Sequence, residues 1–183
     1  MKSQLSSARL RVSVLLTVVA AIVALPVAGS AAPAEPVSAQ ATTTAPVAVG
    51  GAVGNPLSLD GQALRRFPAQ HAWVRFESGQ GTQHHSYRGA LLIDVLNAAR
   101  PSFDPAVKND KLRFAVLAAA TDGYQAVVSW GEIDAEFAGT KVLVAYEEDR
   151  KPLTRPRLVV PGDVKGGRYV SDVESLTVVD LGR

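Results

Sequence analysis

The stretch RPRLVVPGDVKGGRYVSDVESLTVV, residues 155–179, carries the pattern that decides the fold class. An apolar strand stops at a Pro-Gly turn, a short polar loop follows, and the chain then returns to apolar alternation. The loop contains Lys165, Gly166, Gly167 and Arg168. Glycines let backbone N–H groups converge on an oxyanion, so the pattern predicts two strands joined by a candidate anion site. The alternative interpretation is a hairpin with two solvated charges, whose glycines serve only the turn.

The preceding segments also favour strands over long helices. Residues 72–79 alternate Trp, Arg and Glu against Val, Phe and Ser, which predicts a half-buried strand, and the glycines at 79–81 predict a hairpin turn. Residues 47–53 predict an edge or opening strand, and residues 111–124 and 140–153 each predict a strand that ends in a turn. Long strand-helix-strand spacing is missing. The sequence therefore predicts an α+β fold with a mainly β, mixed-sheet or barrel-like core of about seven or eight strands.

Two or three short helices are expected beside the strands. The best is predicted over residues 90–98, because apolar residues there recur at helical spacing on one face. These residues are Leu91, Leu92, Val95, Leu96 and Ala99. Ser58 or Asp60 is expected to cap a brief earlier helix. Ser129, with Glu132 three residues later, predicts a capping box at the start of another.

Residues 1–32 have the layout of a secretory signal peptide. Three basic residues precede a short apolar run, and small residues follow it. The run is shorter than the roughly 20 residues of a membrane span. Residues 33–46 are rich in Ala, Pro and Thr and are expected to form a disordered linker. Residues 47–183 are expected to form one domain that is exported to the periplasm or the cell exterior, with no stable membrane span after cleavage.

Composition limits the chemistry of this domain. The chain contains no cysteine, so it offers no thiolate as a metal ligand or nucleophile. Without the leader, the chain has 16 Lys and Arg against 17 Asp and Glu. A nearly neutral domain gives no electrostatic indication of nucleic-acid binding. The sequence also lacks the nucleophile-elbow, zincin and P-loop motifs of common hydrolases and nucleotide-binding proteins.

Five segments, taken in order, resemble those of a known family. They are NPLSLDGQAL (55–64), YRGALLIDVLNAA (87–99), ATDGYQAVVSWGEI (120–133), VLVAYEEDRKPL (142–153) and the opening stretch. Their order and spacing are similar to those of the molybdopterin-binding domain of sulfite-oxidase-type oxidoreductases, especially its small, single-domain exported members. The resemblance extends from about Gly54 to Leu181. It implies a mixed α+β domain built on a mainly β core.

The resemblance also implies a ligand. In this family a molybdopterin holds molybdenum through its dithiolene, and basic side chains and backbone N–H groups bind its phosphate. Carried onto this sequence, the resemblance and the loop pattern give the candidate cofactor-binding residues His84, His85, Asp122, Tyr124, Lys165, Gly166, Gly167 and Arg168. Molybdopterin, or another pterin or phosphate-bearing small molecule, is therefore the expected ligand.

One departure from the family pattern limits the expected reaction. Full enzymes of the family give molybdenum a cysteine thiolate from the region after the first long strand. This chain reads WVRFESGQGTQHH there, at residues 73–85. Glu77 and Ser78 lie in that region, but neither replaces a thiolate, which suits soft metal centres. Sulfite-oxidase-like catalysis is therefore not expected, and the sequence predicts no catalytic residue.

The histidines and tryptophans have simpler interpretations. His84 and His85 are adjacent, so a regular strand turns them to opposite faces and they cannot share one metal ion. No metal site is predicted, and exposed positions on a hairpin are the alternative for both histidines. Trp73 and Trp130 are expected to pack in the core or at its edge rather than to stack on a ligand.

Three functions remain open from the sequence. The first is an exported, catalytically reduced relative of the molybdopterin-binding domains that serves as a ligand-binding or accessory module, with an exported protein as partner. The second is an active molybdopterin-dependent oxidoreductase that holds its cofactor without a cysteine ligand. The third is a structural or interaction domain that keeps the fold and binds no cofactor.

The leader generates a direct test. N-terminal sequencing of the exported protein is expected to find a mature chain that begins between about Ala31 and Thr42. The reason is that small residues suited to cleavage follow the apolar run. A mature protein that still begins at Met1 would contradict the predicted signal peptide.

Overall fold

The structure, a computed structural model, describes residues 45–182. The predicted signal peptide and residues 33–44 of the predicted linker lie outside these residues. The described strands are β1 (Val47–Gly51), β2 (Leu57–Leu59), β3 (Ala69–Ser78), β4 (Gly81–Leu91), β5 (Phe114–Ala120), β6 (Gln125–Ser129), β7 (Leu143–Glu148), β8 (Lys151–Val159) and β9 (Val173–Asp180). The described helices are α1 (Gly61–Leu64), α2 (Leu92–Ala99) and α3 (Trp130–Ile133), with 3-10 turns η1 (Asp110–Arg113) and η2 (Gly166–Arg168).

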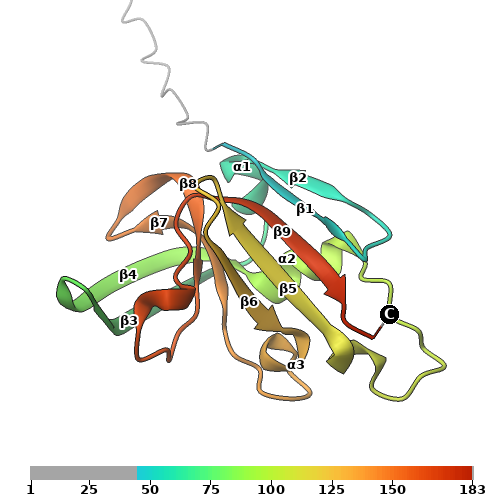
Figure 1. Ribbon diagram of the computed structural model, residues 1–183. Helices are drawn as coiled ribbons and strands as arrows, with labels where there is room; N and C mark the ends of the chain where they lie inside the picture. The colour runs from blue at the N-terminus through green and yellow to red at the C-terminus, as the bar shows by residue number, and fades with distance from the viewer. Residues whose placement is uncertain (1–44, 183) are drawn as a thin grey trace, which may run out of the picture. The chain divides into compact units, whose positions relative to one another are not determined.

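These strands form two sheets (Figure 1). The larger sheet has the order β2-β1-β9-β5-β6, and the smaller has the order β3-β4-β7-β8. The pairs within them are antiparallel except for β1 with β9, which is parallel. The expected α+β class with a mainly β, mixed-sheet core is confirmed, with two open sheets rather than a closed barrel. β1 is the opening strand, but β2 rather than β1 lies at the edge.

The main core joins apolar side chains from both sheets. Val49 of β1, Val116 of β5 and Leu176 of β9 are buried in one cluster. Val144 of β7 and Leu158 of β8 belong to the same cluster. Removing apolar surface from water is the main favourable contribution to folding, so this shared cluster holds the two sheets together.

β7 is buried on both of its faces. Val144 and Tyr146 belong to the main core, whereas Leu143 and Ala145 belong to a second, smaller apolar cluster. Successive side chains of a strand point to opposite faces, so the unbroken apolar run of β7 fits a strand covered on both sides. The run ends at two partly exposed glutamates, the second of which is Glu148.

The helix expected at residues 90–98 is confirmed as α2, but it begins at Leu92. Leu91, which was expected on its apolar face, is the last residue of β4 and packs half-buried against the second cluster. Leu92, Val95, Leu96 and Ala99 are buried on its apolar face and belong to the main core. Side chains three and four residues apart lie on one face of a helix, which is why this spacing predicted the burial correctly. Among the described residues, no helix is both long enough and apolar enough to cross a membrane.

The two shorter helices test the predicted caps. Asp60 caps α1, because its carboxylate accepts a hydrogen bond from the Ala63 N–H at 2.7 Å. Ser129 precedes α3, but its side chain makes no capping hydrogen bond, so the predicted capping box is wrong. Glu132 instead accepts hydrogen bonds from Arg168 at 2.9 and 3.0 Å. A hydrogen bond from a guanidinium is stronger than one from a neutral backbone N–H, and it draws Glu132 away from the cap.

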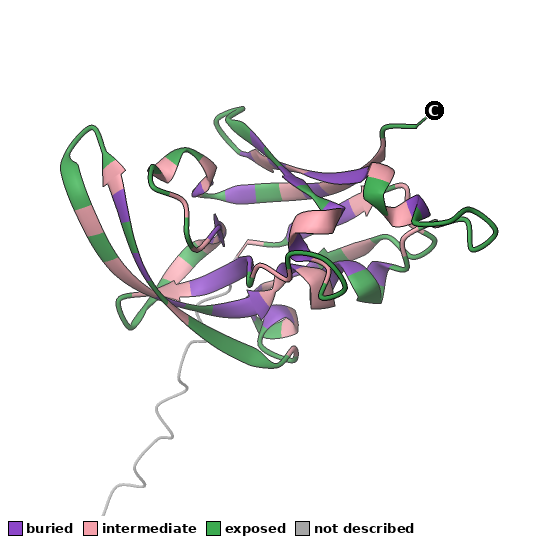
Figure 2. Cartoon of the chain, turned by 90° about the horizontal axis from the view of Figure 1, so that it is seen from below, coloured by how far each residue is buried: buried purple, intermediate pink, exposed green. Residues whose placement is uncertain are grey.

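β3 and β4 form a long hairpin whose outer part is largely exposed (Figure 2). Val74 and Phe76 of β3 are buried, as the alternation predicts. Trp73 is 86% exposed, so core or edge packing is wrong for this residue. It pairs with Ser86 on the outer face of the hairpin, opposite to the second apolar cluster. Trp130 is buried in the main core, as expected.

Replacing Leu96 with alanine is expected to lower the free energy of unfolding by about 2–5 kcal/mol. The side chain is fully buried in the main core, and its removal leaves a cavity. Denaturant titration followed by circular dichroism measures the change. Asn97→Ala is the matched control, because Asn97 is the next residue on α2 and is exposed. It should change stability by no more than about 0.5 kcal/mol, and equal losses in both variants would contradict a core role for Leu96.

Candidate functional site

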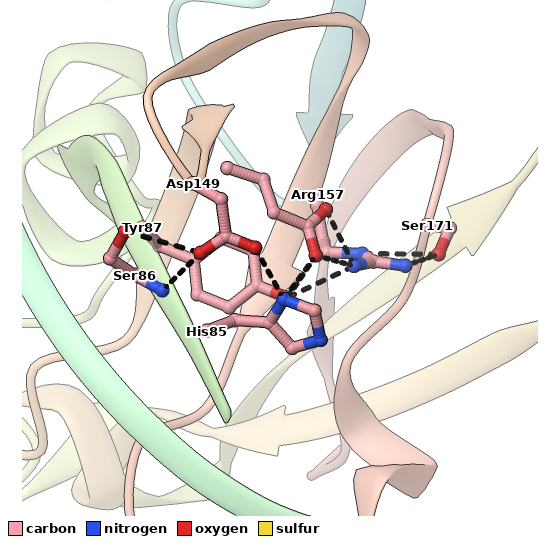
Figure 3. A network of polar contacts seen from close by, with 7 residues as sticks. His85, Ser86, Tyr87, Asp149, Arg157 and Ser171 are labelled. Atoms are coloured by element: carbon pink, nitrogen blue, oxygen red, sulfur yellow. Dashed lines mark hydrogen bonds and ion pairs between the residues drawn. The ribbon is translucent and has the colours of Figure 1, made fainter. Parts of the chain in front are cut away.

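A polar network lies where the apolar run of β7 ends (Figure 3). His85 and Tyr87 are two residues apart on β4, so strand alternation turns them to the same face. Tyr87 pairs across the sheet with Glu148, the last residue of β7, and Asp149 follows in the turn to β8. Arg157 reaches the network from β8. The pairing of β4, β7 and β8 therefore brings together five side chains, two of which come from β4 and lie at least 61 residues before the other three.

Arg157 is the centre of the hydrogen bonds in this network. Its Nη1 lies 2.9 Å from both carboxylate oxygens of Glu148 and 3.0 Å from the Tyr87 hydroxyl. Its Nε donates to the Ser171 hydroxyl at 3.1 Å, and the Tyr87 hydroxyl donates to Glu148 at 2.9 Å. Burial raises the pKa of Tyr87, the Arg157 charge opposes this rise, and the hydrogen bond to Glu148 adds to it. The Tyr87 hydroxyl therefore stays protonated and acts as a donor.

His85 and Asp149 form the more exposed side of the network. His85 Nδ1 lies 2.8 Å from Asp149 Oδ2 and 3.2 Å from Glu148 Oε1. The Ser86 backbone N–H and hydroxyl donate to Asp149 Oδ1 at 2.8 and 3.2 Å. The Ser86 backbone hydrogen bond, followed by the His85 hydrogen bond, lowers the pKa of Asp149. Asp149 and Arg150 have φ values of 49° and 63°, as a two-residue hairpin turn requires, and this turn places Asp149 beside β4.

An open groove of about 530 Å³ lies beside the network. Its lining includes Phe76, Gln80, Gln83, His85, Glu148 and Arg157. The Phe76 ring stacks on the Tyr169 ring with centroids 4.4 Å apart, and the His85 ring lies 6.0 Å from Phe76 at an interplanar angle of 27°. The groove is thus lined mainly by polar side chains, and the His85 ring over the buried Phe76 ring is its aromatic part.

A smaller cavity of about 180 Å³ lies at the turn between β5 and β6. Its lining includes Thr121, Asp122, Tyr124, Tyr169, Ser171 and Asp172. The Tyr169 hydroxyl is buried and has no hydrogen-bond partner among residues 45–182. Burial, followed by the nearby Asp163 charge, raises the pKa of Tyr169, so the hydroxyl keeps its proton. Ser171 of this cavity accepts a hydrogen bond from Arg157, which lines the groove, so one hydrogen bond joins the walls of the two features.

The structure divides the predicted site residues between these features. His85 lies in the network, whereas His84 is exposed on the opposite face of β4, as strand alternation predicts. Asp122 and Tyr124 line the smaller cavity, and the Asp122 carboxylate accepts from the Tyr124 N–H at 2.9 Å. The Tyr124 hydroxyl donates to the Gly167 carbonyl at 2.5 Å. The predicted turn and the predicted loop are therefore in contact, while His84 lies apart from them.

The candidate anion loop is held mainly by contacts within the protein. Arg168 donates to Asp163 and Glu132 over distances of 2.6 to 3.0 Å, and these hydrogen bonds raise its pKa. The two negative charges of these carboxylates thus exceed the single positive charge of the Arg168 guanidinium. Gly166 packs against the Phe76 ring, since a Cβ at this position would lie 2.7 Å from ring carbons. The absence of a side chain at Gly166 therefore serves packing.

Lys165 is the exposed cation of the same loop. Its backbone forms an isolated parallel bridge with Glu77 of β3, which ties the loop to the hairpin. Binding of an anion by this loop stays a prediction, and it depends on Lys165 more than on Arg168 because the latter is already paired with carboxylates.

Sequence reasoning missed Tyr87, Glu148, Asp149, Arg157 and Ser171 as site residues. Tyr87 is separated from Glu148 by 61 positions and from Arg157 by 70, so only strand pairing shows that they meet. One indication was present in the sequence. His85 and Tyr87 have the spacing of neighbours on one face of a strand, and Arg157 is a charged residue beside the apolar run of β8.

Comparison with known proteins supports the fold. The sequence matches no family model and no curated protein. Among solved structures, the chain is similar to the sulfane dehydrogenase SoxCD from Paracoccus pantotrophus, with a TM-score of 0.61 and 19% sequence identity. The similarity covers 76% of this chain and 39% of that chain, so this chain spans well under two thirds of SoxCD. At this identity the likeness shows the fold alone, which is α+β and similar to that of SoxCD.

The residues present do not fit a catalytic molybdenum centre of that family. The chain has no cysteine to supply the thiolate ligand. Arg157 and Arg168, the arginines of the groove and of the loop, are each paired with carboxylates. These pairs leave little net positive charge for a phosphate. The groove does offer the His85 ring and several hydrogen-bonding groups, which suit the organic ring of a pterin better than a metal or a phosphate.

Replacing Arg168 with alanine is expected to lower the free energy of unfolding by about 1–2 kcal/mol. The change leaves Glu132 and Asp163 without their shared cation. The loss is smaller than for a fully buried pair because 34% of the arginine side chain is exposed. Denaturant titration measures it, with Lys165→Ala as the matched control from the same loop. Lys165 is exposed, so its replacement should cost no more than about 0.5 kcal/mol. An unchanged Arg168→Ala variant would show that the pairing has no structural role.

Proposed function

We propose that this protein is an exported ligand-binding or accessory module with the fold of the molybdopterin-binding domains and without sulfite-oxidase-type catalysis. The observation that carries the proposal is the groove beside His85, Glu148 and Arg157, in a chain that has no cysteine. The groove provides binding groups, but the thiolate that suits a molybdenum centre is missing. Support for export comes from the composition of residues 1–32.

The chemistry of the groove favours a flat heteroaromatic ligand such as a pterin. The His85 ring, which lies over the buried Phe76 ring, supplies a face against which such a ligand can stack. Glu148 accepts hydrogen bonds, and the Gln83 side chain both donates and accepts them, which matches ring N–H, amino and carbonyl groups. Because Arg157 is already paired with Glu148, the charge of the groove is close to balanced. A neutral ring is therefore favoured over a phosphate dianion.

The polar wall of the groove is organised before any ligand arrives. Tyr87 and Arg157 hold the Glu148 carboxylate, and Ser171 holds the other side of the Arg157 guanidinium. A group that is already fixed loses little conformational entropy when it binds a ligand, so this arrangement raises affinity. The same arrangement would serve binding without requiring any reaction.

A second candidate function is interaction with an exported protein partner, and the exposure of Trp73 favours it. Trp73 lines an outer-face cavity of about 450 Å³ together with His71, Ser86 and Arg88. Tryptophan and arginine are enriched among the residues that dominate binding energy in protein interfaces. This cavity lies on the face of the hairpin opposite to His85, so the two candidate functions use different surfaces.

Titration of the purified mature protein with pterin, followed by the fluorescence of the pterin itself, tests the proposal. The wild-type protein is expected to bind, and His85→Ala is expected to bind about two- to tenfold more weakly. The reason is that an aromatic contact contributes about 0.5–1.5 kcal/mol, and 1.4 kcal/mol corresponds to tenfold. His84→Ala is the matched control, because this neighbouring side chain lies on the opposite face and should leave the affinity unchanged.

Metal analysis of the same preparation separates the remaining alternatives. Stoichiometric molybdenum together with pterin would support the active oxidoreductase and contradict the proposal. A wild-type protein that binds no pterin would also contradict it and would leave the interaction domain as the better explanation. Equal affinities of wild type and His85→Ala would place any pterin site outside the groove.

A further inference from the structure

We propose that His85, Glu148 and Asp149 form a binding site for a divalent first-row transition-metal cation such as Zn²⁺. One donor atom from each of these residues lies within 4.8 Å of the other two. The histidine comes from β4, the glutamate from the end of β7 and the aspartate from the following turn. This site is separate from molybdenum chemistry and does not depend on the proposed pterin binding.

The distances between the donor atoms suit a small cation. Zinc binds imidazole nitrogen and carboxylate oxygen at about 2.0–2.2 Å, so neighbouring ligand atoms of a tetrahedral site lie about 3.3 Å apart. His85 Nδ1 already lies 2.8 Å from Asp149 Oδ2 and 3.2 Å from Glu148 Oε1. A cation would enter by replacing the proton that Nδ1 shares with these oxygens, with only small movements of the side chains. Three protein ligands leave a fourth position for water or another ligand.

The local charge also favours a cation. Glu148 and Asp149 carry two negative charges, and the nearby Arg157 guanidinium carries one positive charge. With a neutral imidazole the cluster is therefore left with one net negative charge. Glu148 Oε1 accepts hydrogen bonds from both Arg157 and the Tyr87 hydroxyl, so both of its lone pairs are in use. A cation at Oε1 would replace the bond from the arginine, which keeps its bond to Oε2, while the Tyr87 hydroxyl keeps its bond to Oε1.

The two carboxylate ligands accept further hydrogen bonds from the protein, as metal ligands usually do. Asp149 Oδ1 accepts the Ser86 backbone N–H, which leaves Oδ2 directed at His85. The Tyr87 hydroxyl donates to Glu148. Such outer hydrogen bonds orient the ligands and reduce the cost of ordering them around the ion. The side chains of His85 and Glu148 are 24% and 20% exposed, so an ion could reach them from solvent.

The same geometry also fits an imidazolium held between two carboxylates, and calorimetry separates the two explanations. The full mature protein is stripped with EDTA, dialysed and titrated with ZnCl₂ in the absence of pterin. One equivalent of Zn²⁺ is expected to bind. Asp149→Asn should weaken binding at least tenfold because it removes one of the two anionic ligands. Asparagine tolerates the positive φ of this turn and keeps the acceptor for the Ser86 N–H, so the hairpin should remain intact.

His85→Ala should weaken Zn²⁺ binding to the same extent, with His84→Ala as the matched control. His84 is the adjacent residue and is exposed on the other face of β4, so its loss should leave the affinity unchanged. A wild-type protein that binds no Zn²⁺ would overturn the proposal. So would Asp149→Asn or His85→Ala variants that retain the wild-type affinity, because the ion would then bind elsewhere. Melting curves without metal confirm that each variant is folded.

Pterin titration of the Asp149→Asn variant in EDTA keeps this inference distinct from the proposed function. Asp149 does not line the groove but contacts His85 at 2.8 Å, so Asp149→Asn should change pterin affinity much less than the tenfold or greater loss expected for Zn²⁺. Zinc binding without pterin binding would support only the metal site. Pterin binding without zinc binding would support only the groove and would overturn the metal site.

Discussion

Burial of β7 on both faces is the constraint on which the arrangement of the domain depends. Val144 and Tyr146 join the strand to the core shared with the larger sheet, and Leu143 and Ala145 join it to the cluster beneath the β3–β4 hairpin. A fully buried side chain of the size of Val144 or Leu143 contributes roughly 1.5–3 kcal/mol, so the strand is fixed from both sides. The polar network begins at Glu148, where this burial ends. The position of the candidate site is thus a consequence of where the apolar run of β7 stops.

Pairing of charges then decides which chemistry the site supports. Both arginines that a phosphate site would use are bonded to carboxylates, Arg157 to Glu148 and Arg168 to Glu132 and Asp163. The fold resembles that of a sulfane dehydrogenase, but the chain has no cysteine to supply a thiolate. Both arginines form ion pairs within the protein. The similarity in fold therefore does not by itself assign that reaction to this protein. The groove that remains is polar and preorganised, with the His85 ring as its aromatic part.

Patterns that depend on neighbouring residues predicted the structure well. Helical spacing identified the buried face of α2, Asp60 caps α1 as expected, and the glycines after β3 form the predicted hairpin turn. Predictions failed where a distant partner intervened. Ser129 and Glu132 have the spacing of a capping box, but Arg168, 36 positions from Glu132, takes the glutamate. Trp73 was expected in the core because of its residue type, but its pairing with Ser86 places it on the exposed face of the hairpin.

The sequence by itself determined the α+β class, the alternation of the hairpins, the apolar face of α2 and the lack of a thiolate, because each follows from residue type and local spacing. It also determined that His84 and His85 face opposite sides of their strand. Only the tertiary structure decided which of the two meets other polar groups. His85 joins Glu148, Asp149 and Arg157 because β4, β7 and β8 are neighbours in one sheet, and strand order depends on contacts between residues far apart in the chain.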